Sequence, residues 1–288
     1  MDTRRSESSE QASHSLNFPA AMMINSPLLS APDSVLPVPD LAVIVPVCNE
    51  ADNILPLIEE IYHALKGRLV FELIYVDDGS IDTTPVHLAN ARRCHPHLTV
   101  LRHRTSCGQS QALLTGIRAA RAQWIAVLDG DGQNDPADIL ALCLPLQAMD
   151  ANVAARHMIV GWRVTRQDTW SKRVASRLAN YLRATLLKDG TPDTGCGLKL
   201  FPRSAFLDFP YFDHMHRYLP ALMIRAGGQV VSVKVNHRPR VRGRSHYGTL
   251  DRLWVGLFDM IGMMWLQRRN CQPEVGPLSE RAPGDELR

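Results

Sequence analysis

The sequence predicts an α/β fold in which a mostly parallel sheet carries helices on both faces. Three observations predict it: short apolar runs, amphipathic segments of helical period, and the alternation of the two along the first half of the chain. Such alternation joins parallel strands through crossover helices. The 288 residues suffice for one large α/β domain or two small ones, and the composition, 45% hydrophobic and 21% charged, is ordinary for a globular protein.

The predicted elements begin at position 41. Residues 41–45 form an apolar run closed by Pro46, which suits a buried parallel strand. Residues 51–65 are expected to be helical, because Ile54, Leu57, Ile58 and Ile61 recur on one face. The same reasoning predicts further strands at 71–76, 98–102 and 124–128, and further helices at 83–93 and 109–121.

Acidic residues cluster directly after three of the predicted strands. The clusters are Asn49-Glu50 after the first strand, Asp77-Asp78 after the second and Asp129-Gly130-Asp131 after the fourth. In an open α/β sheet the ligand crevice lies beyond the carboxyl ends of the strands. The three clusters are therefore expected to meet at one edge of the sheet.

The turn Asp129-Gly130-Asp131-Gly132-Gln133 is a candidate metal site. Carboxylates two residues apart on a glycine-rich turn can both reach one Mg²⁺ or Mn²⁺, and diphosphate oxygens are natural co-ligands. A phosphatase of the haloacid-dehalogenase type usually carries such a turn on its first strand, followed by Thr. An EF-hand needs Gly and Glu where Asn134 and Leu140 stand. A solvated acidic turn is the remaining alternative.

Charge is unevenly distributed along the chain. The net charge of +3 is too small to indicate a nucleic-acid partner, but Arg and Lys crowd positions 163–269. This split fits an enzyme that handles anionic groups through a bound cation, or a solvated basic face. The six cysteines form no CxxC pair, which indicates reduced intracellular thiols. His214, His216 and His237 are interpreted as core or surface residues rather than metal ligands.

Two further motifs complete a recognisable set. Val45-Pro46-Val47-Cys48-Asn49-Glu50 and Tyr75-Val76-Asp77-Asp78-Gly79-Ser80, with the Asp-Gly-Asp turn, resemble the family 2 glycosyltransferases of the GT-A fold. The best-matching subgroup is dolichol-phosphate mannosyltransferase with its bacterial polyprenyl-phosphate relatives, over about 41–266. The resemblance implies inverting transfer of a sugar, most readily mannose, from GDP-mannose or a UDP-sugar to a polyprenyl or dolichyl phosphate.

The resemblance also implies roles for individual residues. The implied nucleoside pocket consists of Pro46, Asn49, Glu50 and Asp77, with Glu50 on the ribose and Asp77 on the base. Gly108-Gln109 matches a turn of the family, and the implied metal ligands are Asp129, Asp131 and Gln133. The alternative for Asp77-Asp78 is that they cap the helix that begins near Thr83-Thr84.

Basic residues of the second half are the implied phosphate ligands. They are Arg163 in Val160-Gly161-Trp162-Arg163, Lys199 in Asp193-Thr194-Gly195-Cys196-Gly197-Leu198-Lys199, and Arg242 and Arg244 in the loop 240–247. The guanidinium fork of Arg suits phosphate oxygens. Lys199 stands where the family has Arg, and His246 where it has Lys. A basic amphipathic helix expected at 172–187 would contact the acceptor or stay solvated.

Residues 250–269 are expected to form an amphipathic helix after a catalytic domain at 39–249, with disordered tails at 1–38 and 270–288. Its apolar face consists of Trp254, Leu257, Phe258, Ile261 and Trp265. The run is short for a bilayer core and is interrupted by charges, so the helix is predicted to lie in the membrane interface, with docking on the domain as the alternative. Interfacial binding implies a cytoplasmic protein attached peripherally to the inner face of the membrane, alone or through a membrane protein.

The implied reaction is a direct displacement at the anomeric carbon by a phosphate oxygen. This nucleophile is already ionised near neutral pH, so no strong general base is needed. The bound cation and the basic residues named above would neutralise the acceptor and the leaving diphosphate. A sugar or protein hydroxyl acceptor would instead need a base near Asp193 or His246. A non-catalytic module that binds nucleotide-sugars is the third hypothesis.

Overall fold

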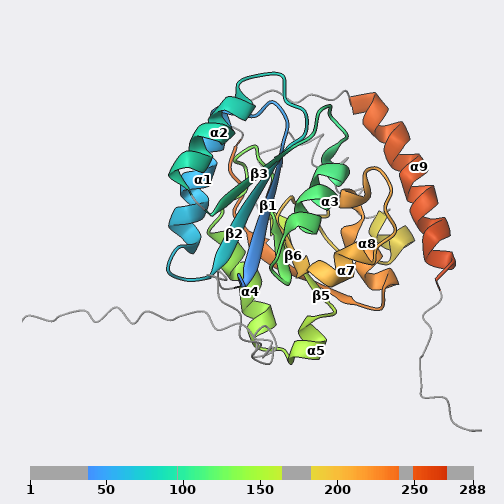
Figure 1. The fold of residues 1–288 in the computed structure, drawn as a ribbon. Helices are drawn as coiled ribbons and strands as arrows, with labels where there is room; N and C mark the ends of the chain where they lie inside the picture. Colours follow the sequence, from blue (N-terminus) through green and yellow to red (C-terminus); the bar gives the residue numbers. More distant parts are fainter. Residues whose placement is uncertain (1–37, 96, 164–182, 240–248, 271–288) are drawn as a thin grey trace, which may run out of the picture.

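The computed structural model describes residues 38–95, 97–163, 183–239 and 249–270 (Figure 1). Within these residues, seven strands form one sheet in the order β3-β2-β1-β4-β6-β5-β7. Parallel pairing joins β1 (Leu41–Val47) to β2 (Phe71–Asp77) and β4 (Trp124–Val127), and β2 to β3 (Leu98–Arg102). β6 (Lys199–Pro202) runs antiparallel between β4 and β5 (His157–Arg163), and β7 (Gln229–Val235) is parallel to β5. The predicted mostly parallel sheet is confirmed, with β6 as the exception.

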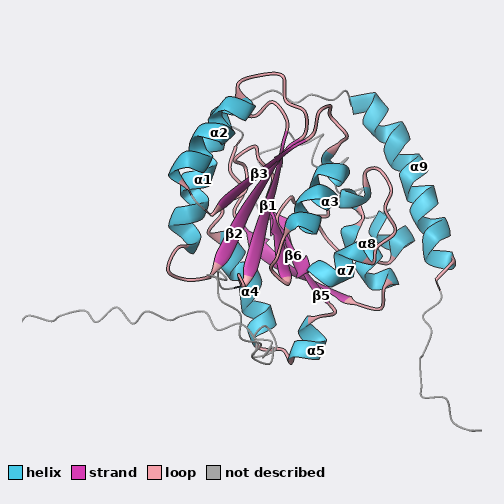
Figure 2. Ribbon diagram, in the orientation of Figure 1, coloured by secondary structure: helices cyan, strands magenta, loops and turns pink. Residues whose placement is uncertain are grey.

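Helices cover both faces of this sheet (Figure 2). One face carries α1 (Ala51–Leu65), α2 (Thr84–Cys94), α4 (Asp138–Gln147) and the short α5 (Ala151–Ala154). The other carries α3 (Gln109–Ala119), α7 (Arg203–Leu207), the 3₁₀ turn η2 (Met215–Arg217), α8 (Leu219–Arg225) and α9 (Thr249–Arg268).

The side chains of β1 divide the core into two layers. Val43 and Val45 pack in the cluster that includes α1, whereas Ala42 and Ile44 pack in the cluster that includes α3. All four are fully buried, since successive side chains of a strand point to opposite faces and both faces are covered. This double burial explains why the strand reads as a continuous apolar run in the sequence.

α9 docks on the domain by one side only. Met263 of α9 packs in the core and is 1% exposed. The backbone carbonyls of Gly256 and Leu266 on α9 accept hydrogen bonds from Tyr218 and Arg225, each at 3.1 Å. The opposite side exposes a stripe of Phe258, Ile261 and Trp265, at 69%, 56% and 60%. Among the described helices, none combines the length and the apolarity that crossing a bilayer requires. The side chains of Trp254 and Leu257 fall outside the description.

The predicted elements match the observed ones to within two residues. The helix predicted at 51–65 has the bounds of α1 and the strand at 98–102 those of β3, while α2 and α3 end at Cys94 and Ala119. Of the basic helix predicted at 172–187, only 183–187 lies among the described residues, and it is helical. The tails and the domain boundaries stay predictions.

Candidate functional site

The loops that follow β1 and β2 are tied together by backbone hydrogen bonds. The Asp78 N–H donates to Val47 O at 2.8 Å, which extends the contact of the two strands beyond the end of β2. The Glu50 N–H donates to Thr84 Oγ1 at 3.0 Å, so the start of α1 is held against the start of α2. The two acidic clusters therefore lie next to each other.

The side chain of Asn49 helps to join the two loops. Its φ of 56° lies in the left-handed region, which Asn tolerates better than most residues. Its Oδ1 accepts the Ile81 N–H at 2.9 Å, and its own N–H donates to Ser80 Oγ at 2.8 Å. The carboxamide that was expected in the nucleoside pocket thus holds the loop after β2.

The Asp129-Gly130-Asp131 turn lies against the end of β1. A Cβ at Gly130 would overlap the side chain of Val47, so only glycine allows this approach. Gly132 has a φ of 72°, and a Cβ there would lie 3.7 Å from Asn53 Oδ1. The Asn53 amide donates to Glu50 Oε2 at 2.6 Å. Glu50 and the turn are therefore neighbours on either side of Asn53, as the predicted convergence requires.

Asp129 is a half-buried carboxylate with both an acidic and two basic neighbours. Burial, and then the neighbouring Asp131 carboxylate, raise the pKa of Asp129, while the charges of Lys199 and Arg163 act in the opposite direction. The ionised form is therefore less favourable than in water, and a further cation beside the two carboxylates would stabilise it.

The Asp129 carboxylate is also held in place from two sides. Gln109, the first residue of α3, donates its Nε2–H to Asp129 Oδ1 at 3.0 Å. On the other side, a Cβ at Gly197 would overlap the carboxylate, so the backbone before β6 packs directly against it. Its orientation is therefore fixed before any ligand binds.

The two described cations predicted to bind phosphate already have partners. Arg163 donates from Nε and Nη2 to the two carboxylate oxygens of Asp193, at 2.7 and 2.9 Å. Lys199 is 5% exposed and donates to the backbone carbonyl of Cys196. Burial lowers the pKa of Lys199. The structure therefore does not present the Lys199 ammonium to solvent, and one edge of the Arg163 fork is occupied.

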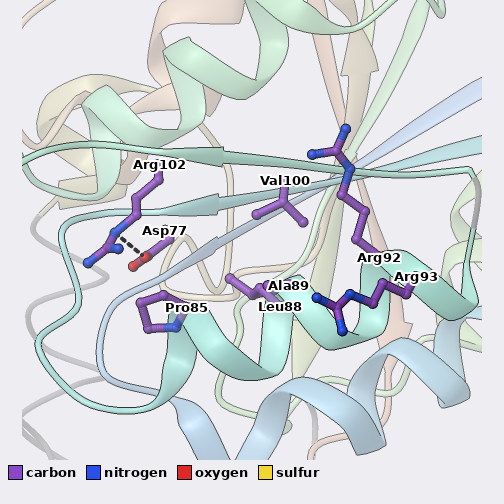
Figure 3. Close-up of a pocket in the computed structure, with 8 residues that line it drawn as sticks. All are labelled: Asp77, Pro85, Leu88, Ala89, Arg92, Arg93, Val100 and Arg102. Carbon is purple, nitrogen blue, oxygen red and sulfur yellow. Dashed lines mark ion pairs between the residues drawn. The ribbon is translucent and has the colours of Figure 1, made fainter.

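Asp77 is fully buried and pairs with a cation that the sequence analysis did not single out. Its Oδ1 accepts the Ser80 N–H at 2.9 Å, and its Oδ2 lies 3.0 Å from Arg102 Nε with no hydrogen bond directed at it among the described residues. Both residues line a cavity of about 520 Å³ between α2 and β3. Figure 3 shows them facing each other at one end of this cavity, with Arg92 and Arg93 at the other.

The alternative that Asp77-Asp78 cap α2 is wrong. The Thr84 N–H donates to Asp82 Oδ1 at 2.9 Å, so Asp82 binds the start of this helix. Asp77 closes its own turn through Ser80, and Asp78 binds the loop before α3 instead.

The chain after β7 returns to the acidic turn. The Arg238 N–H donates to Gln133 O at 2.9 Å, and the Arg238 guanidinium pairs with Glu60 and Asp135 at 2.6 and 2.8 Å. The predicted phosphate ligands Arg242 and Arg244, with His246, lie outside the described residues. The segment that leads into them begins beside the turn.

Residues 42–209 match the family model described as glycosyl transferase family 2. The chain belongs to this family. It is therefore a glycosyltransferase, as its motifs predicted, and the hypothesis of a non-catalytic module is not needed.

Two curated relatives of this glycosyltransferase are named for polyprenyl phosphates. The dodecaprenyl-phosphate galacturonate synthase of Rhizobium johnstonii is 32% identical over 242 residues, which are 81% of this chain and 69% of the relative. The undecaprenyl-phosphate 4-deoxy-4-formamido-L-arabinose transferase of Edwardsiella ictaluri is 28% identical over 224 residues, which are 77% of this chain and 66% of the relative. The glycosyltransferase thus spans about two thirds of the length of each.

Solved structures share the fold. Glucosyl-3-phosphoglycerate synthase from Mycobacterium tuberculosis, in complex with Mn²⁺, UDP and glucosyl-3-phosphoglycerate, superposes with a TM-score of 0.59 at 17% identity, over 80% of each chain. The mannosyltransferase PcManGT from Pyrobaculum calidifontis, in complex with GDP-Man and Mn²⁺, gives 0.58 at 23% identity, over 86% of this chain and 69% of the other. The predicted GT-A fold is confirmed.

Sequence reasoning missed two contacts of this glycosyltransferase's site. The partner of Asp77 could have been found, because Arg102 ends β3 directly opposite Asp77 in the parallel register. The pairing of Arg163 with Asp193 joins β5 to the loop before β6, and the local sequence of neither segment indicates it.

Proposed function

We propose that this glycosyltransferase transfers a sugar, with inversion at the anomeric carbon, from a nucleoside-diphosphate sugar to a polyprenyl phosphate. The observation that carries the proposal is the placement of the Asp129-Gly130-Asp131 turn next to Glu50, at the sheet edge where Asp77 also lies. A nucleoside diphosphate laid across this edge would have its base near Asp77, its ribose near Glu50 and its diphosphate near the turn. Pro46, at the end of β1, and Gly108 would border it.

Asp77 and Arg102 restrict the base. The pair places a buried acceptor oxygen, to which no hydrogen bond is directed among the described residues, beside a guanidinium donor. Uracil and guanine carry a ring N–H next to a carbonyl oxygen, which complements this pair. Cytosine and adenine carry an unprotonated ring nitrogen next to an amino group, which reverses the pattern and leaves the buried carboxylate unmatched. The donor is therefore a UDP- or GDP-sugar.

Asp129 and Asp131, with Gln133, fit a divalent cation of the Mg²⁺ or Mn²⁺ type. Two nearby carboxylates, one with a raised pKa, form a donor set that a hard cation relieves. Such an ion would supply positive charge to the donor diphosphate. Lys199 lies beneath this set and neutralises Asp129 rather than contacting phosphate, which revises its predicted role.

The acceptor is an anion that needs no deprotonation. Asp193, one of the two positions near which a base for a hydroxyl acceptor was expected, has both carboxylate oxygens bound by Arg163, and the other, His246, lies outside the described residues. Arg163, oriented by Asp193, would offer its remaining N–H groups to a phosphate, and Arg242 and Arg244 would join from the loop that starts beside Gln133. The names of both curated relatives support a polyprenyl phosphate in this position.

The exposed stripe of α9 supports attachment to a membrane. Aromatic and aliphatic side chains on one side of a helix, followed by Arg268 and Arg269, are typical of a helix that lies in the headgroup region. We propose that the protein binds the cytoplasmic leaflet in this way, directly or with a membrane protein, where a lipid phosphate would meet the site.

A donor panel tests the proposal. The full chain is incubated with Mn²⁺, a short polyprenyl phosphate in detergent, and labelled sugars on UDP, GDP, ADP or CDP, including GDP-mannose and the nucleotide form of galacturonate. Mannose is the sugar that the resemblance predicts, and galacturonate is the one in the name of the 32% identical relative. We expect an acid-labile lipid product of inverted anomeric configuration from a UDP- or GDP-sugar only. Transfer to a free hydroxyl acceptor but never to the lipid phosphate would refute the proposal.

A further inference from the structure

Asp78 is a buried carboxylate with four donors. It is 5% exposed. Its Oδ1 accepts from His103 Nδ1 at 2.7 Å and the Cys107 N–H at 2.8 Å, and its Oδ2 from Ser106 Oγ at 2.7 Å and the Gly108 N–H at 2.9 Å. Burial alone would raise the pKa of Asp78, but the donors, the Cys107 amide first, outweigh it and lower the pKa. The carboxylate is therefore ionised and fully used.

The ligand atoms of Asp78, His103 and Cys107 also lie within 4.8 Å of one another, as in a metal site. Hydrogen bonding argues against that use. Both oxygens of Asp78 accept two donors each, and the second ring nitrogen of His103 is 2.9 Å from Thr115 Oγ1 on α3. A metal would have to displace several of these bonds at once, so the group is better understood as an anchor.

The anchored loop leads directly to the acidic turn. Gly79 has a φ of 71°, and a Cβ there would lie 2.5 Å from Ser106 N, so the turn after β2 packs backbone to backbone on the loop before α3. Asp78 then fixes the last two amides of that loop. Gly108, with a φ of 88°, turns the chain into α3, and Gln109 donates to Asp129 Oδ1 at 3.0 Å.

The start of α3 is fixed on its other side as well. Ser110 is fully buried, and its Oγ lies 2.8 Å from Nδ1 of His216 in η2. With Asp78 on one side and His216 on the other, the first turn of α3 has little freedom. The amide of Gln109 can therefore be aimed at Asp129 by contacts that do not themselves touch the acidic turn.

We propose that Asp78 is a positioning residue for the candidate cation site, acting through the loop before α3 to hold Gln109 against Asp129. This inference rests on the proposed function, in which Asp129 and Asp131 bind the cation. Substitution of residues that orient metal ligands commonly lowers metal affinity by about 10- to 100-fold. Asp78, whose four hydrogen bonds come from the loop before α3 and not from the turn, is expected to behave in this way.

The test compares two acidic residues of the same loop. Asp78→Asn replaces one acceptor oxygen by an NH₂ group, which then faces the donors that bind the Asp78 carboxylate. Asp82→Asn makes the same chemical change at a residue that holds Thr84 at the start of α2 instead. Mn²⁺ binding is measured by electron paramagnetic resonance with UDP and with GDP present, and folding by circular dichroism and thermal unfolding. We expect the Mn²⁺ Kd of Asp78→Asn to rise about tenfold, and that of Asp82→Asn to stay within twofold of the wild type.

Two further variants show whether Asp78 acts through Gln109. Gln109→Ala should raise the Mn²⁺ Kd to a similar extent with little loss of stability, because this side chain is exposed. The double variant Asp78→Asn/Gln109→Ala should bind Mn²⁺ no more weakly than the weaker-binding of the two single variants, since the effects of coupled residues are not additive. If Asp78→Asn does not fold, Ser106→Ala, which removes one donor to the same carboxylate, should raise the Kd about threefold.

The outcomes separate the inference from the function on which it rests. An Asp78→Asn protein that loses thermal stability but keeps the wild-type Mn²⁺ Kd would show that Asp78 is merely structural and would overturn the inference. The inference would also be overturned if the effects of Asp78→Asn and Gln109→Ala on the free energy of Mn²⁺ binding were fully additive. A wild-type protein that binds no Mn²⁺ in the presence of either nucleotide would overturn the proposed function itself.

Discussion

Asp77 and Asp78 are neighbours in the chain and have different environments in the fold. Asp77 is the last residue of β2 and points into the α1 and α2 side of the sheet, toward Arg102. Asp78 points toward the loop before α3. The alternation of side chains along a strand produces this division. One carboxylate keeps an oxygen to which no hydrogen bond is directed among the described residues, and the other accepts four hydrogen bonds from the protein.

Arg102→Ala should weaken nucleotide binding. The guanidinium is proposed to donate to the base carbonyl and to balance the buried charge of Asp77, so we expect the Kd for UDP or GDP to rise about tenfold, which corresponds to about 1.4 kcal/mol. Calorimetric titration measures this, with Arg118→Ala, an exposed arginine of α3, as the control. An unchanged Kd for Arg102→Ala would remove Arg102 from the donor site.

His216 should make stability depend on pH. Burial lowers the pKa of His216 to about 3, whereas an unfolded histidine titrates near 6.5. Between these values the unfolded state binds the extra proton, so the free energy of unfolding falls as the pH is lowered from 6.5, by up to about 1.4 kcal/mol per unit from this group. In urea unfolding between pH 7 and 4.5, the free energy of unfolding should depend less steeply on pH for His216→Asn than for the wild type. Equal slopes in the wild type and His216→Asn would contradict the buried neutral state.

Among the helices, α3 packs so closely on the sheet that one of its positions has room only for glycine. A Cβ at Gly116 would lie 2.7 Å from Cγ2 of Ile44 on β1. Gly116→Ala should therefore destabilise the fold by about 1–3 kcal/mol through overpacking, measured by urea unfolding. Gly262→Ala is the matched control, because a Cβ there meets nothing within 4 Å on α9 and alanine favours a helix. Tolerance of Gly116→Ala would mean that α3 is less tightly seated than the structure has it.

The exposed stripe of α9 should control membrane binding. Replacing Phe258, Ile261 and Trp265 together by Ser removes apolar area that is solvent-exposed in the fold, so we expect unfolding to be unaffected and binding to anionic vesicles to fall more than tenfold. Vesicle co-sedimentation measures this. Val86→Ser, at an exposed apolar residue of α2, is the control. Wild-type binding by the triple variant would place the membrane contact elsewhere.

At the scale of the whole molecule, local patterns foretold the first half of the fold better than the second. Apolar runs and helical periods define β1 to β4, and parallel pairing then brings Glu50, Asp77 and Asp129 to one edge. The antiparallel insertion of β6 could not be foreseen, since Lys199–Pro202 carries no local sign of its partners. Hydrogen bonds that join distant segments, such as those of Asp78 and Asp193, were likewise outside the reach of spacing and composition.

In the proposed function, Asp129 and Asp131 hold a divalent cation which fixes the donor diphosphate. Calorimetric titration of UDP and GDP into the wild type and into Asp131→Asn, each with Mn²⁺ and with EDTA, tests it most directly. We expect that the wild type binds nucleotide only with Mn²⁺ present and that the variant loses affinity by about 100-fold or more. Nucleotide binding that is equally tight in EDTA and in Asp131→Asn would contradict it.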